Sequence, residues 1–238
     1  MDHFSLDFFT LPPIAAVLDA AYYGILGLAE LLAPLAGGAS AALAIVAVTL
    51  VVRLVLIPVG ASQVKAEWTR RRLAPMLKDL QAKYKKNPQK LQEKTMELYK
   101  REGASPFAGM LPLLAQAPIV SIVYAVFIRA TVDGHANALL TEHLFGVPLG
   151  AGLVHAAWPG VLVFVGLALV MAVTAWWSRR VILRLNPETP GWLSWLSFLP
   201  IVFAAFVPLA AVLYLAVSGV WTQVERVLLK RRYWPAEA

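Results

Sequence analysis

The sequence contains four long runs without Asp, Glu, Lys or Arg, and these runs restrict what the chain can fold into. They cover residues 31–52, 103–128, 144–178 and 189–224 and contain 22, 26, 35 and 36 residues. About 20 apolar residues suffice to cross a bilayer as an α-helix, so each run can span at least once. Because 59% of the residues are hydrophobic and only 15% are charged, the composition also suits a surface that faces lipid. The sequence therefore predicts an all-α integral membrane protein.

The distribution of Lys and Arg predicts the orientation of the chain. Residues 61–104 contain 12 of the 21 basic side chains, residues 179–184 contain three, and residues 225–238 contain four. Residues 1–40 and 131–156 contain none. Since basic segments stay on the cytoplasmic side, we expect the N-terminus to lie outside and the C-terminus in the cytoplasm.

Charge also decides how often the last apolar run crosses. The run 189–224 begins and ends beside segments expected in the cytoplasm, so it must cross an even number of times. Two short helices that fold back near Pro208 satisfy this condition. The predicted organisation is an extracytoplasmic N-terminus with an interfacial helix (1–40), a first transmembrane helix (41–60), a cytoplasmic basic helical hairpin (61–104), a second transmembrane helix (105–130), an extracytoplasmic loop (131–157), a third transmembrane helix (158–178), a cytoplasmic loop (179–191), the fourth and fifth transmembrane helices (192–224) and a cytoplasmic basic tail (225–238).

Residues 12–35 admit two interpretations. They are apolar enough for a further span, but Asp19, Tyr23 and Glu30 recur along one helical face. This pattern favours an amphipathic helix in the membrane interface. A sixth span is the alternative, although it would place an N-terminus without basic residues in the cytoplasm.

The segment 61–104 carries the whole excess charge of the protein, with 12 basic and five acidic side chains. Leu73, Leu77 and Leu80 are spaced as on a helix, and Asn87-Pro88 provides a break before a second helix. The resulting hairpin could be a solvated loop that fixes topology and touches anionic lipid, or a docking site for a partner. The candidate docking residues are Lys78, Lys83, Lys85, Lys86 and Lys90.

Arg53 lies well inside the first predicted span. A charge at this depth costs at least about 2.5 kcal/mol, and the other predicted spans contain no acidic residue that could pair with it. We therefore expect water to solvate Arg53 in a hydrophilic cavity, although the side chain could also reach the cytoplasmic headgroups. The polar residues expected to line this cavity are Thr49, Gln116, Thr174, Ser178, Tyr214 and Ser218.

The sequence has no motif for covalent chemistry. It contains no phosphate-binding GxxxxGK[ST] loop, no HExxH and no cysteine. His135, His143 and His155 are poorly spaced for a metal site. We expect no cofactor, no metal and no enzymatic activity.

Two segments in fixed order resemble the YidC family of membrane protein insertases. They are TLVVRLVLIPVG at 49–60 and, after the charged hairpin, LYKREGASPFAGMLPLLAQAPI at 98–119. The resemblance implies the short bacterial form without a large extracytoplasmic domain, in which five helices surround a hydrophilic groove that is closed toward the outside. It places Arg53 at the centre of the groove beside Thr49 and Gln116. By the same resemblance, Ala117, Val120 and Tyr214 contact the substrate, although Ala117 and Val120 replace bulkier side chains of relatives.

The resemblance implies insertion and folding of nascent membrane proteins in the bacterial cytoplasmic membrane, by a chain that functions as a monomer. Expected partners are nascent membrane proteins and lipids, with the ribosome, targeting factors and a translocation channel as further candidates. Two other functions fit the residues: a transporter that binds a small solute or anion at Arg53, and an assembly chaperone that translocates nothing.

Overall fold

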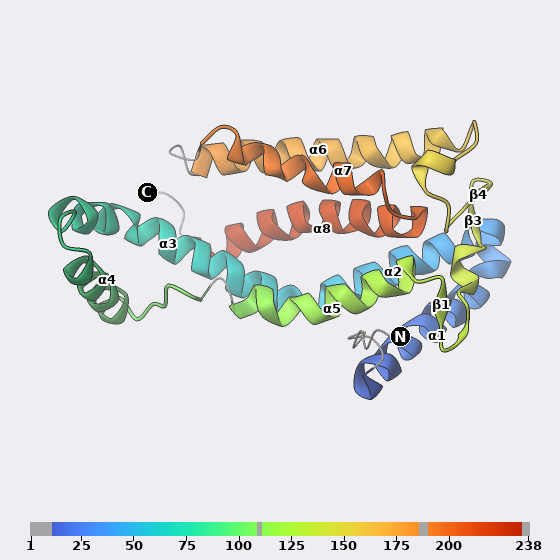
Figure 1. The fold of residues 1–238 in the computed structure, drawn as a ribbon, viewed down its shortest axis with the longest axis horizontal. Coiled ribbons are helices and arrows are strands. Elements are labelled where there is room, and N and C mark those ends of the chain that lie inside the picture. Colours follow the sequence, from blue (N-terminus) through green and yellow to red (C-terminus); the bar gives the residue numbers. More distant parts are fainter. Residues whose placement is uncertain (1–10, 109–110, 186–189, 235–238) are drawn as a thin grey trace, which may run out of the picture. The chain divides into compact units, whose positions relative to one another are not determined.

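A computed structural model describes residues 11–108, 111–185 and 190–234 and is mostly helical (Figure 1). The prediction of a helical protein is therefore confirmed, with four very short strands added in one loop. The chain divides into two compact units, which are described separately below. The elements are α1 (Pro12–Ala36), η2 (Gly37–Ala39), α2 (Ser40–Val55), α3 (Ile57–Lys83), α4 (Pro88–Arg101), α5 (Leu111–Ile128), β1 (Thr131–Val132), β2 (His135–Ala136), η3 (Ala138–Leu140), β3 (His143–Leu144), β4 (Val147–Pro148), η4 (Leu153–His155), α6 (Val161–Leu185), η5 (Leu193–Phe198), α7 (Leu199–Ala204) and α8 (Leu209–Tyr233).

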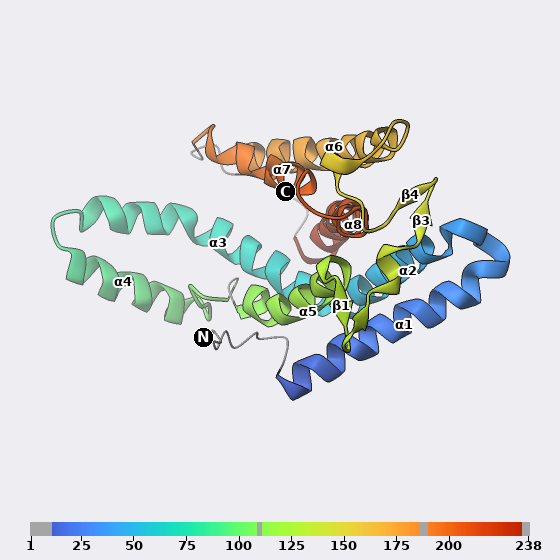
Figure 2. The same cartoon turned by 45° about the vertical axis from the view of Figure 1, so that its right-hand side comes forward.

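The first unit comprises Met1–Leu54 and Ile119–Val224. Its helices α1 and α2 are separated by a sharp turn at Gly37, whose φ of 52° favours glycine (Figure 2). The buried side chains of α1 recur every three or four residues, so one face of this helix packs into the core. This face consists of Leu18, Tyr22, Ile25 and Ala29.

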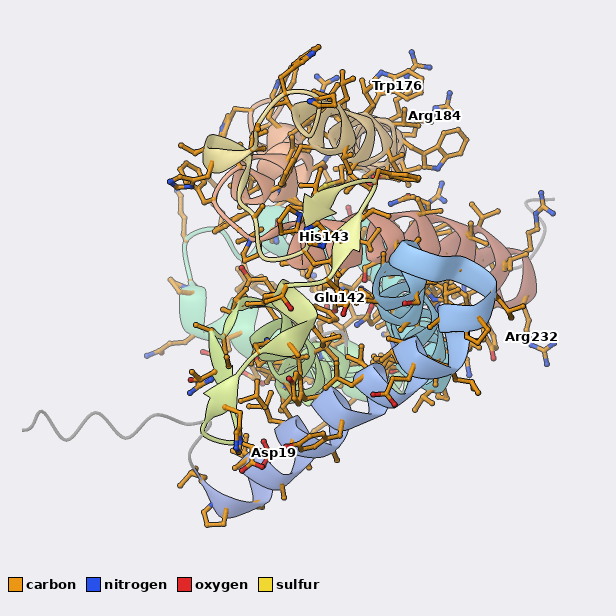
Figure 3. The ribbon with its side chains drawn as sticks, turned by 90° about the vertical axis from the view of Figure 1, so that its right-hand side faces the viewer. Asp19, Glu142, His143, Trp176, Arg184 and Arg232 are labelled. Atoms are coloured by element: carbon orange, nitrogen blue, oxygen red, sulfur yellow. The ribbon has the colours of Figure 1, made fainter. Side chains whose placement is uncertain are left out.

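The loop after α5 contains two antiparallel β-hairpins, β1–β2 and β3–β4. Each turns through two residues with positive φ, Asp133-Gly134 and Phe145-Gly146, as two-residue hairpin loops require. Figure 3 shows Glu142 and His143 in this loop. Strands of two residues are too short for a hydrophobicity pattern to detect, so the sequence predicts only a loop over 131–157.

The segment predicted as the fourth span is less regular than a simple transmembrane helix. Residues 193–198 form the 3-10 helix η5, and α7 adds only six residues. At about 2.0 and 1.5 Å rise per residue, the two together extend roughly 21 Å, which is shorter than the hydrocarbon core. Both pack against α6.

Three helical segments in the described part of the chain are long and apolar enough to cross a membrane. They are Pro12–Val55, which includes both α1 and α2, Val161–Arg184 and Leu209–Tyr233. This supports a multi-pass membrane protein, whereas the five-span arrangement and the interfacial position of α1 remain predictions.

The second unit comprises Val55–Pro118 and Glu225–Ala238. Helices α3 and α4 lie side by side in it as a hairpin (Figures 1 and 2). Asn87 precedes Pro88 at the start of α4 and accepts a hydrogen bond from the Lys90 amide at 3.0 Å. Leu73, Leu98 and Tyr99 form the buried contact of the hairpin. The helix break predicted at Asn87-Pro88 is therefore confirmed.

Candidate functional site

Thr49 and Arg53 lie one turn apart on α2, at the edge of the core of the first unit. Thr49 is fully buried, and its hydroxyl donates to the Ile45 carbonyl at 2.6 Å, which satisfies it within its own helix. Arg53 is half-buried. Within the described residues, no ion pair or hydrogen bond joins its guanidinium to another side chain. In the part of the chain that the structure describes, no protein group therefore compensates its charge.

Tyr214 and Ser218 lie one turn apart on α8. Tyr214 is buried, and its ring centroid lies 5.9 Å from that of Phe127 on α5. The Ser218 side chain is buried too, but its hydroxyl has no hydrogen-bond partner among the described residues. A buried hydroxyl without a partner costs about 1–3 kcal/mol. In the described part of the molecule, Ser218 is the one residue with a buried side-chain nitrogen or oxygen that makes no hydrogen bond.

The core of the first unit lies at the end where the helices meet the loop 129–160. Helix α2 contributes buried side chains up to Thr49, α5 from Val123 onward, and α8 from Leu209 to Ser218. Along α2 after Thr49 the side chains are half-buried or exposed; Val51, for example, is 58% accessible. The helices are therefore tightly packed at the loop end, and Arg53 lies where this packing ends.

The loop 129–160 is attached to several helices by hydrogen bonds. The Asn137 amide donates to the carbonyl oxygens of Val126 and Arg129 at 2.8 and 2.9 Å. Because α5 ends at Ile128, the Val126 carbonyl is one of the acceptors that a helix end leaves free. The Tyr22 hydroxyl of α1 accepts from the Ala138 amide at 2.9 Å.

The same loop also satisfies the start of α8. The amides of Leu209 and Ala210 donate to the carbonyls of Ala151 and Leu149, both at 2.9 Å. The first amides of a helix have no acceptor within the helix, and here two carbonyls of the loop backbone act as acceptors for two of these amides. These bonds close the packed end of the first unit.

Two residues expected to line the cavity lie in the contact between α6 and α8. Ser178 accepts a hydrogen bond from the Gln223 amide at 2.7 Å. Thr174 donates to the Met171 carbonyl in its own helix, and a Cβ at Gly219 would lie 3.3 Å from its hydroxyl. Sequence reasoning missed Gln223, because a polar residue near the end of a span gives no sign of its partner.

The remaining predicted groove residues lie on α5. The side chains of Gln116 and Val120 fall outside the described residues. Ala117 is exposed and belongs to the second unit. The structure therefore places four of the predicted groove residues in the first unit, on α2 and α8: Thr49, Arg53, Tyr214 and Ser218.

The predicted docking lysines lie at the tip of the hairpin in the second unit. All five are exposed, and the ammonium groups of Lys83 and Lys90 lie 5.7 and 5.8 Å from the centre of the Tyr84 ring. These distances fit cation–π contacts that gather positive charge around the turn. The tip therefore presents a cationic surface.

Sequence reasoning missed a clasp between α3 and the end of α8. The Glu67 carboxylate accepts from Arg226 at 2.8 Å and from Lys230 at 2.9 Å. Burial raises the pKa of the Glu67 carboxyl, but the hydrogen bonds from Lys230 and Arg226 outweigh this effect and hold the pKa below its ordinary value. The Trp234 indole donates a hydrogen bond to the Val64 carbonyl at 3.3 Å, and its ring makes a tilted contact with that of Trp68, with centroids 5.5 Å apart.

Comparison with known proteins identifies the family. The family model described as 60Kd inner membrane protein matches residues 32–236. A protein of Helicobacter pylori named membrane protein insertase YidC is 28% identical over 194 residues, which cover 79% of this chain and 32% of that protein. The protein of the same name from Wolinella succinogenes is 32% identical over 194 residues, covering 79% and 33%. Inner membrane ALBINO3-like protein 2, chloroplastic, from Chlamydomonas reinhardtii is 29% identical over 210 residues, covering 79% and 49%.

The chain thus spans a third to a half of the length of these relatives, whereas the family model covers most of the chain. The matched region includes α2 with Arg53, the basic hairpin and α8. The chain therefore belongs to the 60Kd inner membrane protein family, which is the family of the YidC membrane protein insertases that its sequence resembles.

Proposed function

We propose that the chain inserts membrane proteins through a hydrophilic groove centred on Arg53. The observation that carries the proposal is the half-buried Arg53 guanidinium, which has no protein counter-charge among the described residues. A charged side chain in hydrocarbon costs free energy. Because Arg53 has no protein partner among the described residues, we infer that water or a polar group of the substrate lies beside it. The relatives named as insertases support the same activity.

The arrangement of the core supports a groove that is open at one end. Tight packing and the loop 129–160 close the end of the first unit that we propose faces outward. The positive-inside distribution of Lys and Arg places the other end, with Arg53, toward the cytoplasm. In this arrangement five spans place the N-terminus outside and the C-terminus inside the bacterial cytoplasmic membrane.

The mechanism needs no covalent step. A polar or acidic N-terminal tail of the substrate enters the groove, where Arg53 attracts it and where its path through hydrocarbon is shortened. At an effective dielectric constant of about 20, a carboxylate roughly 6 Å from the guanidinium gains about 3 kcal/mol. Transfer of the following apolar helix into lipid then drives insertion along α5 and α8. Ala117, on the exposed surface of α5, is available to this helix.

The hairpin lysines serve as the docking surface in this proposal. Their exposed positive charge suits long-range attraction of a ribosome, a targeting factor or a translocation channel. The proposal also takes the chain to function as a monomer.

The test compares Arg53→Lys and Arg53→Ala in proteoliposomes with single-span substrates that carry either acidic or neutral tails. The Lys variant should retain insertion of the acidic-tailed substrate. The Ala variant should lose about tenfold or more of it, because each 1.4 kcal/mol corresponds to a factor of ten. The neutral-tailed substrate is the control, since its insertion should depend less on Arg53. Equal insertion of the acidic-tailed substrate by all three proteins would refute the role of the charge.

A second measurement locates the substrate. A photo-crosslinker at Ala117 should form adducts with a ribosome-bound nascent chain. A crosslinker at Leu169, which is 62% exposed on α6, is the matched control and should form few. Equal adducts at the two positions would contradict a groove that includes α5.

A further inference from the structure

The second unit contains a cavity of about 750 Å³ at the base of the hairpin. One wall is a stretch of α3 from Pro58 to Arg70, and the other is the end of α4 with the loop that follows, from Tyr99 to Ala108. Tyr233, near the end of α8, completes it. All of these residues belong to the second unit, so the cavity is formed within one compact unit. Its volume falls within the range of small-molecule sites, roughly 300–1,000 Å³.

The α3 wall presents cations and hydroxyl groups on one face. Ser62, Lys65 and Thr69 are three and four residues apart, and Arg70 follows directly. Thr69 donates its hydroxyl hydrogen to the Lys65 carbonyl at 3.1 Å. Among the described residues, no hydrogen bond or ion pair occupies the polar side-chain groups of Ser62 and Arg70. These donors therefore remain available to a ligand.

Lys65 is held at the cavity by an aromatic side chain. Its ammonium lies 4.4 Å from the centre of the Tyr233 ring, which is a cation–π distance. Such a contact restrains the side chain and leaves the three hydrogen-bond donors of the ammonium free. Lys65 can thus bind an anion without losing a carboxylate partner.

The opposite wall does not repel an anion. It contains one acidic residue, Glu102, whose carboxylate lies 3.3 Å from Arg72 and 3.4 Å from Arg101. The remaining side chains of the lining include several small apolar groups, such as Ala61, Ala104 and Ala108. The cavity therefore combines free cations with small apolar groups in one lining, which suits an amphiphilic anion.

Aromatic residues of the same unit indicate where this amphiphile comes from. Tyr233 lines the cavity and packs on the same apolar cluster as Trp234, whose ring contacts that of Trp68. The Arg71 guanidinium and the Lys230 ammonium lie 5.4 and 4.2 Å from the centre of the Trp234 ring. Tryptophan and tyrosine next to basic side chains are typical of the membrane–water interface. Basic pockets at the cytoplasmic side of transmembrane helices bind the headgroups of anionic lipids. We propose that this cavity binds the headgroup of an anionic phospholipid, with Lys65, Arg70 and Ser62 contacting the phosphate oxygens.

The experiment titrates the purified full chain in detergent with phosphatidylglycerol and, separately, with phosphatidylcholine, and counts bound lipid by native mass spectrometry. The test variant combines Lys65→Gln with Arg70→Gln. The matched control combines Lys83→Gln with Lys86→Gln, which removes the same charge at the tip of the same hairpin. Because it removes two charge-assisted contacts to the phosphate, the test variant should bind phosphatidylglycerol at least about tenfold more weakly. The tip variant should stay within about threefold of the unsubstituted protein.

A third variant separates loss of charge from loss of structure. Lys65→Arg combined with Arg70→Lys keeps both charges and should retain most of the binding, although the geometry of each donor changes. Circular dichroism and thermal unfolding should be unchanged in all variants, because Lys65 and Arg70 are exposed.

Four outcomes would overturn the proposal. The first is equal binding of phosphatidylglycerol and phosphatidylcholine, and the second is an equal loss in the cavity and tip variants. The third is a charge-retaining variant as weak as the Gln variant. The fourth is binding of soluble glycerol phosphate as tightly as the diacyl lipid, which would assign the cavity to a soluble phosphate.

Discussion

Replacing Ser218 with Ala should make the protein more stable and less active. The Ser218 hydroxyl is buried on α8 without a hydrogen-bond partner in the described part of the chain. Serine in a helix often donates to the carbonyl four residues earlier, but no such bond to Tyr214 is present here. An unsatisfied buried hydroxyl costs about 1–3 kcal/mol, and Ala removes it with almost no change of shape. With about 2–4 °C per kcal/mol for a chain of this size, the melting temperature should rise by roughly 2–12 °C.

The assay is thermal unfolding in one detergent, followed by insertion of an acidic-tailed substrate in proteoliposomes. Thr222→Val is the matched control, because its exposed hydroxyl already donates to the Ser218 carbonyl at 2.8 Å and its loss should change stability by less than about 0.5 kcal/mol. Insertion by Ser218→Ala should fall by about twofold to tenfold, which corresponds to one hydrogen bond to a substrate tail. An unchanged melting temperature would refute the reasoning, because the hydroxyl would then already have a partner in the folded protein.

Three further predictions concern contacts within single units. Asn137→Asp should lower the free energy of unfolding by about 2–4 kcal/mol in thermal or denaturant unfolding, because a carboxylate cannot donate to the two carbonyls at the end of α5; wild-type stability would contradict that cap. The pKa of the Glu67 carboxyl is lowered from 4.5 in the folded protein, so the clasp should be intact above pH 4.5 and should open as the pH falls through this lowered pKa. The opening should change the fluorescence of Trp234, and Glu67→Gln should show the same change already at pH 7. The absence of an acid transition would rule out this ion pair. Gly150→Ala should destabilise by about 1–3 kcal/mol, because its Cβ would lie 2.8 Å from the Leu140 Cβ, whereas Gly166→Ala meets nothing within 4 Å and should not be destabilised.

Local sequence signals predicted the elements whose cause is local. Asn87-Pro88 marks the turn of the hairpin because asparagine caps a helix start and proline fits its first position. The break at Leu56 is not predicted: the sequence predicts a first span that continues to residue 60, whereas α2 ends at Val55 and Pro58 lies in the first turn of α3. The long charge-free runs correspond to apolar helices for the same reason, since helical hydropathy needs no knowledge of the partner.

Contacts between distant residues could not be predicted in this way. Glu67 pairs with Arg226 and Lys230 across 159 and 163 positions, and one sequence offers many equally plausible partners for each charge. The two-residue strands of the loop are too short for any alternation of hydrophobicity. Thr174 and Ser178 resemble cavity-lining residues in sequence, because a hydroxyl that packs between two helices has the same local signature as one that faces water.

The packed end of the first unit at the loop 129–160 and the opposite edge of its core at Arg53 depend on each other. A groove between helices requires their side chains to remain unpacked on one side, and unpacked helices need an anchor elsewhere to stay folded. The loop 129–160 provides that anchor by binding the end of α5 and the start of α8 through backbone and Asn137 hydrogen bonds. Substitutions at the two ends should therefore have different effects, one on stability and the other on insertion. Asn137 variants should lose stability in proportion to the cap, while Arg53 variants should lose insertion at nearly constant stability, because Arg53 has no partner in the described part of the protein to leave behind.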